Sequence, residues 1–159
     1  MNIKIISVGK IKESFYRDAV SEYIKRLSRY CKTSVVEVDD EKTPDNASDH
    51  QVELILDKEG ERIAKYIGED DHVIALAIEG EMFDSVSFAK NIDRLGISGK
   101  SNIVFVIGGS LGLSEGIKRR ADRLLSFSKM TFPHQLMRVI LLEQIYRAYR
   151  IINNEPYHK

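Results

Sequence analysis

Two loops in the C-terminal half of the chain have the composition expected of a ligand-binding site. The first, 108–116, contains four glycines and follows the apolar run 103–107; the second, 126–133, is polar and follows a shorter apolar run. Because glycine has no Cβ, the backbone of the first loop can approach a ligand closely. Two such loops, each at the end of a buried strand, suit a nucleotide-like cofactor. The simpler alternative is that the glycines form a tight turn and the start of a helix.

The glycine-rich segments do not match three well-known motifs. The tetrapeptide Ser-Gly-Lys-Ser at 98–101 resembles the end of a Walker loop, but Arg94 replaces the leading glycine, and the segment precedes its strand instead of following one. The glycines of 108–116 do not fit G-x-G-x-x-G, and the acidic residue expected about 20 positions later is missing. Ser110 is in the wrong register for a nucleophile elbow. The ATPase, dehydrogenase and hydrolase interpretations are all weakened.

Charge is distributed unevenly along a chain whose net charge is zero. Residues 1–80 contain 12 Lys and Arg against 17 Asp and Glu, whereas residues 81–159 contain 12 against 7. Between Lys118 and Arg150 there are eight basic residues and only two acidic ones. A basic region beside glycine-rich loops favours a phosphate-rich partner. The alternative is an ordinary solvated surface.

Length and composition indicate a single soluble domain, 1–159, that is large enough to bury one core. No apolar run approaches the roughly 18 residues of a membrane span, and the N-terminus shows no signal peptide. The only cysteine, Cys31, excludes an internal disulfide. The four histidines do not group with acids at metal-ligand spacing. We therefore expect a cytoplasmic protein that uses neither a membrane nor a metal.

Apolar runs alternate with amphipathic stretches along the chain. We expect strands at 3–8, 33–38, 72–78, 103–107 and, weakly, 124–125, and helices starting at Ser14, Val52, Ser85 and His134. Ser14 is the expected N-cap of the first helix, and Gly68 is expected to end the second. This alternation predicts an α/β fold with a mostly parallel sheet flanked by helices. Because parallel strands end at one edge, the segments 76–80, 107–112 and 126–133 should converge there.

The final helix is expected to extend from His134 to Asn153, with apolar residues around almost its whole circumference. A helix that is apolar all round must be buried on more than one side. Because a terminal helix of a small domain is hard to bury within its own chain, this pattern favours an isologous homodimer. The alternative is a central core helix. Glu143 and Arg147 have the i,i+4 spacing of an ion pair.

Four segments together resemble a known family over essentially the whole chain. They are Ile-Lys-Ile-Ile-Ser-Val-Gly-Lys at 3–10, Phe-Val-Ile-Gly-Gly at 105–109, Lys-Met-Thr-Phe-Pro-His at 129–134 and Asn-Glu-Pro-Tyr-His-Lys at 154–159. The chain closely resembles the SPOUT-class large-subunit ribosomal RNA methyltransferases of the H type, the pseudouridine N3-methyltransferases of bacteria. The resemblance implies a deep C-terminal trefoil knot, which is an exception to the rule that chains do not thread loops. It also implies a homodimer with its active site near the subunit interface.

The resemblance further implies a cofactor, a substrate and the residues that serve them. The cofactor would be S-adenosylmethionine, and the substrate a pseudouridine in a stem-loop of 23S rRNA within the assembled 70S ribosome. The implied cofactor-binding residues are Leu76, Gly108, Phe127, Ser128, Lys129, Met130, Thr131 and Phe132. RNA contacts would come from Lys118, Arg119, Arg120, Arg123, Arg26 and Arg29. Two rivals stay open: a SPOUT enzyme that acts on tRNA, and a non-catalytic ribosome-binding module.

The C-terminal tail holds the candidate catalytic residues Tyr157, His158 and Lys159. N3 of pseudouridine carries a proton that must leave, to solvent or to a side chain, before the nitrogen can accept a methyl group. Neutral His158 is a candidate acceptor of that proton, and Lys159 a candidate to stabilise the resulting anion. Arg138 and His134 are expected to stand behind them.

Overall fold

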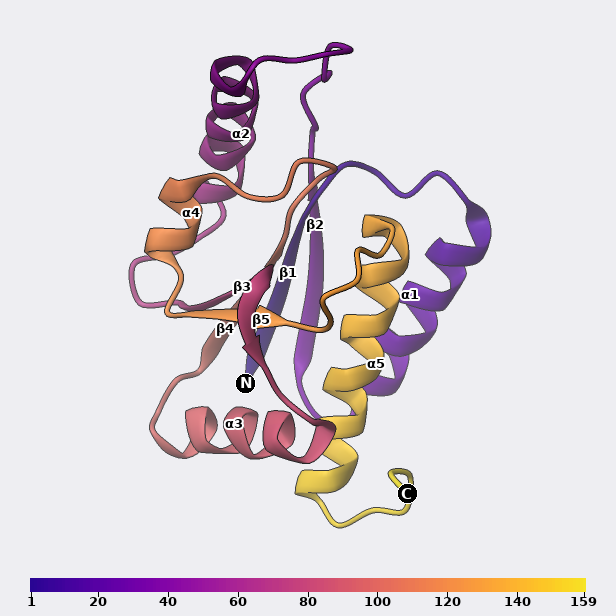
Figure 1. The fold of residues 1–159 in the computed structure, drawn as a ribbon. Helices are drawn as coiled ribbons and strands as arrows, with labels where there is room; N and C mark the ends of the chain where they lie inside the picture. The colour runs from indigo at the N-terminus through magenta and orange to yellow at the C-terminus, as the bar shows by residue number, and fades with distance from the viewer.

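The computed structural model describes residues 1–159, and its helices and strands build around one sheet (Figure 1). The strands are β1 (Asn2–Val8), β2 (Lys32–Val38), β3 (His72–Met82), β4 (Asn102–Ile107) and β5 (Arg123–Ser126). The helices are α1 (Ser14–Leu27), α2 (Asp49–Ala64), α3 (Ser85–Ile97), α4 (Glu115–Arg120) and α5 (His134–Ile152).

All five strands are parallel and lie in the order β2-β1-β4-β3-β5. Helices α2 and α4 pack on one face of the sheet, and α1, α3 and α5 pack on the other (Figure 1). On β4, Phe105 belongs to the core under α1, α3 and α5, whereas Val104 and Val106 belong to the core under α2 and α4. A strand buried on both faces has a continuous apolar sequence, as 103–107 does. The predicted α/β fold with a parallel sheet flanked by helices is confirmed.

The ends of α1 and α2 differ from the sequence prediction. Ser14 is already helical, and the N-cap of α1 is Glu13, whose side chain makes no capping hydrogen bond. Helix α2 ends at Ala64, before Gly68, whose N–H donates to Asp71 Oδ2 at 2.6 Å in a separate turn. Helix α2 begins at Asp49, before the predicted start at Val52, because Ser48 caps it and exchanges hydrogen bonds with Gln51 in a capping box.

Strand β3 continues past the predicted end at 78 and bends across β5 (Figure 1). Leu125 of β5 pairs with Leu76 before the bend and with Glu81 after it. Gly80 permits this crossing, since a Cβ there would lie 2.7 Å from the carbonyl carbon of Leu124. The bend keeps the segment after Leu76 over the end of β5, where a site can form.

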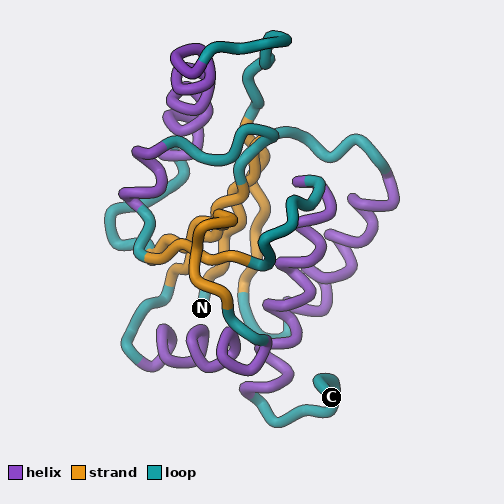
Figure 2. Tube along the Cα trace, in the orientation of Figure 1, coloured by secondary structure: helices purple, strands orange, loops and turns teal.

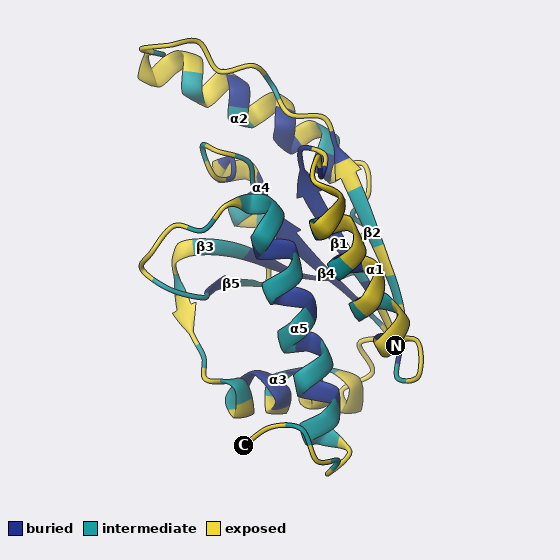
Figure 3. Cartoon of the chain, turned by 90° about the vertical axis from the view of Figure 1, so that its right-hand side faces the viewer, coloured by how far each residue is buried: buried dark blue, intermediate teal, exposed yellow.

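Helix α5 packs between α1 and α3 (Figure 3). Its buried side chains are Met137, Arg138, Leu141, Leu142, Ile145, Ala148 and Tyr149. The remaining residues of the helix are half-buried, and none is exposed. Much of the apolar circumference is therefore covered within one chain, while the half-buried outer face stays available to a partner. The trefoil knot implied by the family resemblance concerns this C-terminal segment and stays a prediction.

Candidate active site

A cavity of about 730 Å³ lies at the carboxyl edge of the sheet. The loop after β4 and the loop after β5, both drawn in teal in Figure 2, form much of its wall. Its lining comes from 76–79, 107–113, Lys118, 125–128, 130–134 and Met137. The predicted convergence of the three segments that follow β3, β4 and β5 is confirmed.

In the glycine turn after β4, the backbone of Gly108 and Gly109 packs directly against that of Gly112. The N–H of Gly112 donates to the carbonyl oxygen of Gly109 at 3.1 Å, and Gly112 has a φ of +90°. A Cβ on Gly108 would lie 2.6 Å from the carbonyl carbon of Gly112 and closer still to its oxygen. The turn therefore needs glycine at 108 for space and at 112 for backbone conformation. Gly116 is the second residue of α4, so the alternative of a tight turn followed by a helix start also holds.

The loop after β5 is held by its two serines. The hydroxyl of Ser126 donates to the carbonyl oxygen of Ser128 at 3.1 Å, and the hydroxyl of Ser128 accepts the Met130 N–H at 3.0 Å. Among the expected cofactor-binding residues, those that line the cavity are Leu76, Gly108, Phe127, Ser128, Met130, Thr131 and Phe132. Lys129 is exposed and does not line it.

Three ionisable side chains line the cavity: Glu79, Lys118 and His134. Glu79 lies in the segment 76–80 that was predicted to converge here, whereas Lys118 was expected to contact RNA and His134 to stand behind the tail. Lys118 Nζ lies 2.7 Å from Glu79 Oε1; this hydrogen bond lowers the pKa of Glu79 and raises that of Lys118. Burial, followed by the charge of Arg138, lowers the pKa of His134, so its ring is neutral at pH 7.

The C-terminal tail folds back on α5 and is well anchored there. Tyr157 donates its hydroxyl hydrogen to Glu143 Oε1 at 3.1 Å, and the Arg147 guanidinium lies 4.7 Å from the centre of the Tyr157 ring. The predicted Glu143–Arg147 pair is present, with NH2 of Arg147 2.7 Å from Oε1. Burial, and then the hydrogen bond to Glu143, raise the pKa of Tyr157, so its phenol stays protonated at neutral pH.

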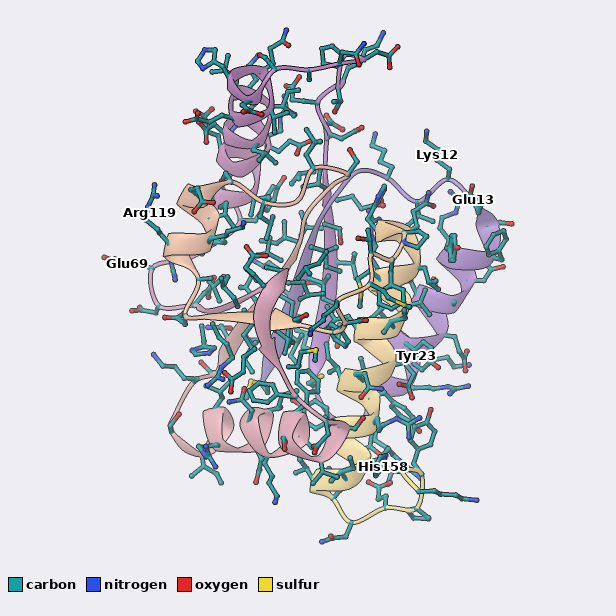
Figure 4. All side chains as sticks on the ribbon, viewed as in Figure 1. Lys12, Glu13, Tyr23, Glu69, Arg119 and His158 are labelled. Carbon is teal, nitrogen blue, oxygen red and sulfur yellow. The ribbon has the colours of Figure 1, made fainter.

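His158 and Lys159 lie beyond the end of α5. Figure 4 shows His158 near this end of the helix, where its Nδ1 is 3.2 Å from NH1 of Arg147. His158 lines a second cavity of about 540 Å³ between the start of α3 and α5. The two cavities share the wall formed by 125–127. Lys159 is exposed. The structure thus places the tail and the cofactor candidates at neighbouring cavities, not in one.

Arg138 does not stand behind the tail, contrary to the expectation from sequence. Its side chain is fully buried and donates to Glu37 Oε2 at 2.6 Å and to the carbonyl oxygen of Gly9 at 2.7 Å. Glu37 also accepts the N–H of Ile11 at 2.8 Å. Arg138 therefore fastens the segment after β1 to α5.

Most of the basic residues expected to contact RNA are already engaged within the chain. Lys118 pairs with Glu79, Arg123 with Glu81, and Arg120 donates to the carbonyl oxygens of Gly68 and Asp71. On the opposite side, Arg26 pairs with Glu22 and Arg29 with Glu155. Arg119 is exposed and makes no ion pair (Figure 4). The basic stretch of the sequence is therefore only partly a free cationic surface.

No three or more His, Cys, Asp or Glu side chains are grouped so that they could hold a metal ion. None of the helices has the length and apolar character needed to cross a membrane.

A parallel sheet whose carboxyl edge encloses a mostly neutral cavity is the architecture of cofactor-dependent α/β enzymes. Two solved structures share the fold. A probable methyltransferase from Bordetella pertussis has a TM-score of 0.59 at 16% identity, and the match covers 92% of this chain and 93% of that one. A probable methylase family protein from Haemophilus influenzae has a TM-score of 0.56 at 14% identity, over 99% of this chain and 70% of that one.

Sequence likeness is more specific. Residues 1–158 match the family described as "Predicted SPOUT methyltransferase". Proteins named ribosomal RNA large subunit methyltransferase H are 60% identical in Clostridium kluyveri and 64% identical in Bifidobacterium adolescentis, each over 100% of both chains. The chain belongs to the SPOUT methyltransferase family.

Proposed function

We propose that this chain uses S-adenosylmethionine to methylate N3 of a pseudouridine in 23S rRNA, acting in the cytoplasm on the assembled 70S ribosome as a homodimer. The observation that carries the proposal is the meeting of Leu76, Gly108 and the loop 127–132 around one cavity. These segments are far apart in the sequence, and the family resemblance implies all of them as cofactor-binding. The full-length relatives named as large-subunit rRNA methyltransferases support the choice of RNA.

The cavity fits S-adenosylmethionine in size and chemistry. Its volume of about 730 Å³ lies within the usual range of small-molecule sites, which are mostly apolar with a few polar groups. Leu76, Phe127 and Phe132 supply apolar walls for the adenine, and Gly108 lines the cavity beside them. Lys129 would contribute through its backbone. When bound, S-adenosylmethionine supplies an already activated methyl group, so the reaction needs neither a metal nor a covalent enzyme intermediate.

The tail would orient the base and stabilise its anion. A guanidinium can only donate hydrogen bonds, so Arg147 fixes His158 with Nδ1 as acceptor and the proton on Nε2. In this tautomer His158 offers an N–H to a carbonyl oxygen of the base instead of a free acceptor for its N3 proton. Tyr157, held by Glu143, stays a neutral phenol. Lys159 would stabilise the negative charge after the proton leaves to solvent.

Transfer of labelled methyl from S-adenosylmethionine tests the proposal. The acceptors are 70S ribosomes, separated subunits and bulk tRNA from cells lacking this gene. Label in 23S rRNA that maps to N3 of a pseudouridine supports the proposal, and label only in tRNA supports the first rival. Ribosome binding without any transfer supports the non-catalytic module. His158→Ala should reduce the label, whereas His50→Ala, at an exposed histidine of α2, should not.

A further inference from the structure

The ion pair between Glu79 and Lys118 stands at the edge of the cavity and joins two of its walls. Glu79 belongs to the bent part of β3, and Lys118 belongs to α4. The Lys118 ammonium lies 2.7 Å from the Glu79 carboxylate and 3.7 Å from that of Glu115, which does not line the cavity. The Glu79 side chain is 56% exposed and the Lys118 side chain 23% exposed.

A contribution to stability does not explain this pair well. Ion pairs that are open to solvent contribute on the order of 1 kcal/mol or less to folding. Both partners nevertheless line the cavity, where His134 is the third ionisable group and is neutral at pH 7. The fixed charges facing the cavity are therefore one carboxylate and one ammonium, side by side.

We propose that Glu79 and Lys118 form the subsite for the amino-acid end of the methyl donor, with Lys118 binding its α-carboxylate and Glu79 its α-ammonium. This inference rests on the proposed use of S-adenosylmethionine. The amino-acid end of that molecule carries one carboxylate and one ammonium, as the pair does. On binding, Lys118 exchanges the Glu79 carboxylate for the carboxylate of the ligand, and Glu79 exchanges the Lys118 ammonium for the ammonium of the ligand. The rest of the lining is uncharged, which suits the adenine and ribose. A charge left without a partner in the cavity would disfavour binding. After the exchange, both protein charges and both ligand charges have a partner.

Calorimetric titration with two nucleosides tests the subsite without requiring catalysis. S-adenosylhomocysteine has the amino-acid end, and 5′-methylthioadenosine lacks it but keeps the adenine, ribose and sulfur. We expect Glu79→Gln and Lys118→Met to raise the Kd of S-adenosylhomocysteine about tenfold each, as expected for loss of a hydrogen bond to a charged group. The Kd of 5′-methylthioadenosine should change less than twofold. Glu115→Gln and Arg119→Gln, which remove charges from α4 outside the cavity, should change neither.

A double variant in which the charges of residues 79 and 118 are swapped distinguishes recognition of the ligand from a purely structural role of the ion pair. Glu79→Lys combined with Lys118→Glu keeps an ion pair between β3 and α4 but reverses its direction. It should keep 5′-methylthioadenosine binding at the wild-type value and leave S-adenosylhomocysteine binding weak. Full recovery of S-adenosylhomocysteine binding in this double variant, or equal weakening of both ligands by Lys118→Met, would overturn the subsite. If the wild type binds neither nucleoside, the proposed cofactor fails and the subsite with it. Unchanged S-adenosylhomocysteine binding in both single variants overturns the subsite alone.

Discussion

Replacing Gly108 with alanine is the most direct test of how the cavity is built. The added Cβ would lie 2.6 Å from the carbonyl carbon of Gly112, an atom of the backbone that cannot rotate away. Ordinary contacts of this kind exceed 3.4 Å, so the two segments must separate by roughly an ångström, and overpacking of this kind typically costs about 1–3 kcal/mol. Because both glycines line the cavity, the same displacement should distort its wall.

We expect Gly108→Ala to lower the midpoint of urea unfolding by about 1 M, from a loss near 2 kcal/mol and a slope of ~2 kcal/mol/M. Isothermal titration should show at least a tenfold weaker affinity for S-adenosylhomocysteine. Gly116→Ala is the matched control: it lies in α4, its Cβ would be 3.9 Å from the nearest atom, and its φ is not positive. That variant should be stabilised by about 0.5 kcal/mol and keep wild-type affinity.

The reasoning would be refuted if Gly108→Ala unfolded at the wild-type urea concentration and bound S-adenosylhomocysteine normally. Such a result would mean that the turn can relax without moving the wall. Gly112→Ala gives an internal comparison, because no atom lies within 4 Å of its added Cβ but its φ is +90°. The free energy of unfolding of Gly112→Ala should fall by about 1–2 kcal/mol, from backbone strain alone.

Three further substitutions test the buried groups and the tail. Arg138→Met should lower the free energy of unfolding by about 3 kcal/mol. This is the low end for a broken buried ion pair, because Glu37 keeps some access to water. A loss below about 1 kcal/mol in chemical denaturation would contradict this account. Tyr157→Phe removes only the hydrogen bond to Glu143. The affinity for S-adenosylhomocysteine should therefore stay within twofold of wild type, while the rate of single-turnover rRNA methylation falls about tenfold. An unchanged rate would exclude a role for that hydrogen bond in catalysis. Burial raises the pKa of Glu59 above its unfolded value, so the stability that this side chain contributes is fully present in acid and is lost as pH rises from about 4.3 through the folded pKa. Glu59→Gln should therefore be the more stable protein at pH 7 and lose this advantage below pH ~4; thermal unfolding curves that coincide at pH 7 would count against it.

The part of the fold that the sequence predicted is the part governed by local pattern. Runs of five to seven residues identified β1 to β4, and the pair 124–125 weakly indicated β5. Their alternation with amphipathic stretches predicted a parallel sheet. Convergence of the segments after β3, β4 and β5 followed from the rule that parallel strands end at one edge. For the same reason most of the cavity lining was predictable before any contact was known.

The features that the sequence missed depend on contacts between distant segments. Arg138 was expected to stand behind the tail, but its partner is Glu37, which is 101 positions away in the sequence. Lys118 belonged to a basic run, and its partner Glu79 lies 39 positions earlier in the sequence, on β3. Ser14 was a reasonable N-cap by residue type, but the chain enters α1 one residue earlier. Pattern alone does not determine which residues meet across the fold.

The distance between the tail and the cavity bears on how an active site could be completed. Helix α5 contributes His134 and Met137 to the cavity, whereas Arg147, which holds His158, lies 13 positions beyond His134. At 1.5 Å per residue, Arg147 and His134 are roughly 20 Å apart along the helix axis. The cavity that His158 lines shares only the wall 125–127 with the first cavity, yet the methyl group and N3 must meet at about 3 Å. A tail from the second protomer would remove the difficulty, in agreement with the proposed homodimer.

Mixed dimers test this arrangement. Gly108→Ala weakens the cavity and His158→Ala weakens the tail, so each homodimer should have little activity at S-adenosylmethionine concentrations below the Kd of the Gly108→Ala cavity. If the tail of one protomer serves the cavity of the other, each mixed dimer has one intact site. Random mixing makes half of the dimers mixed, so about a quarter of wild-type methylation should return. If each tail serves its own cavity, every site in the mixed dimer carries one defect, and no activity should return. Recovery on mixing therefore requires that the site be shared between protomers.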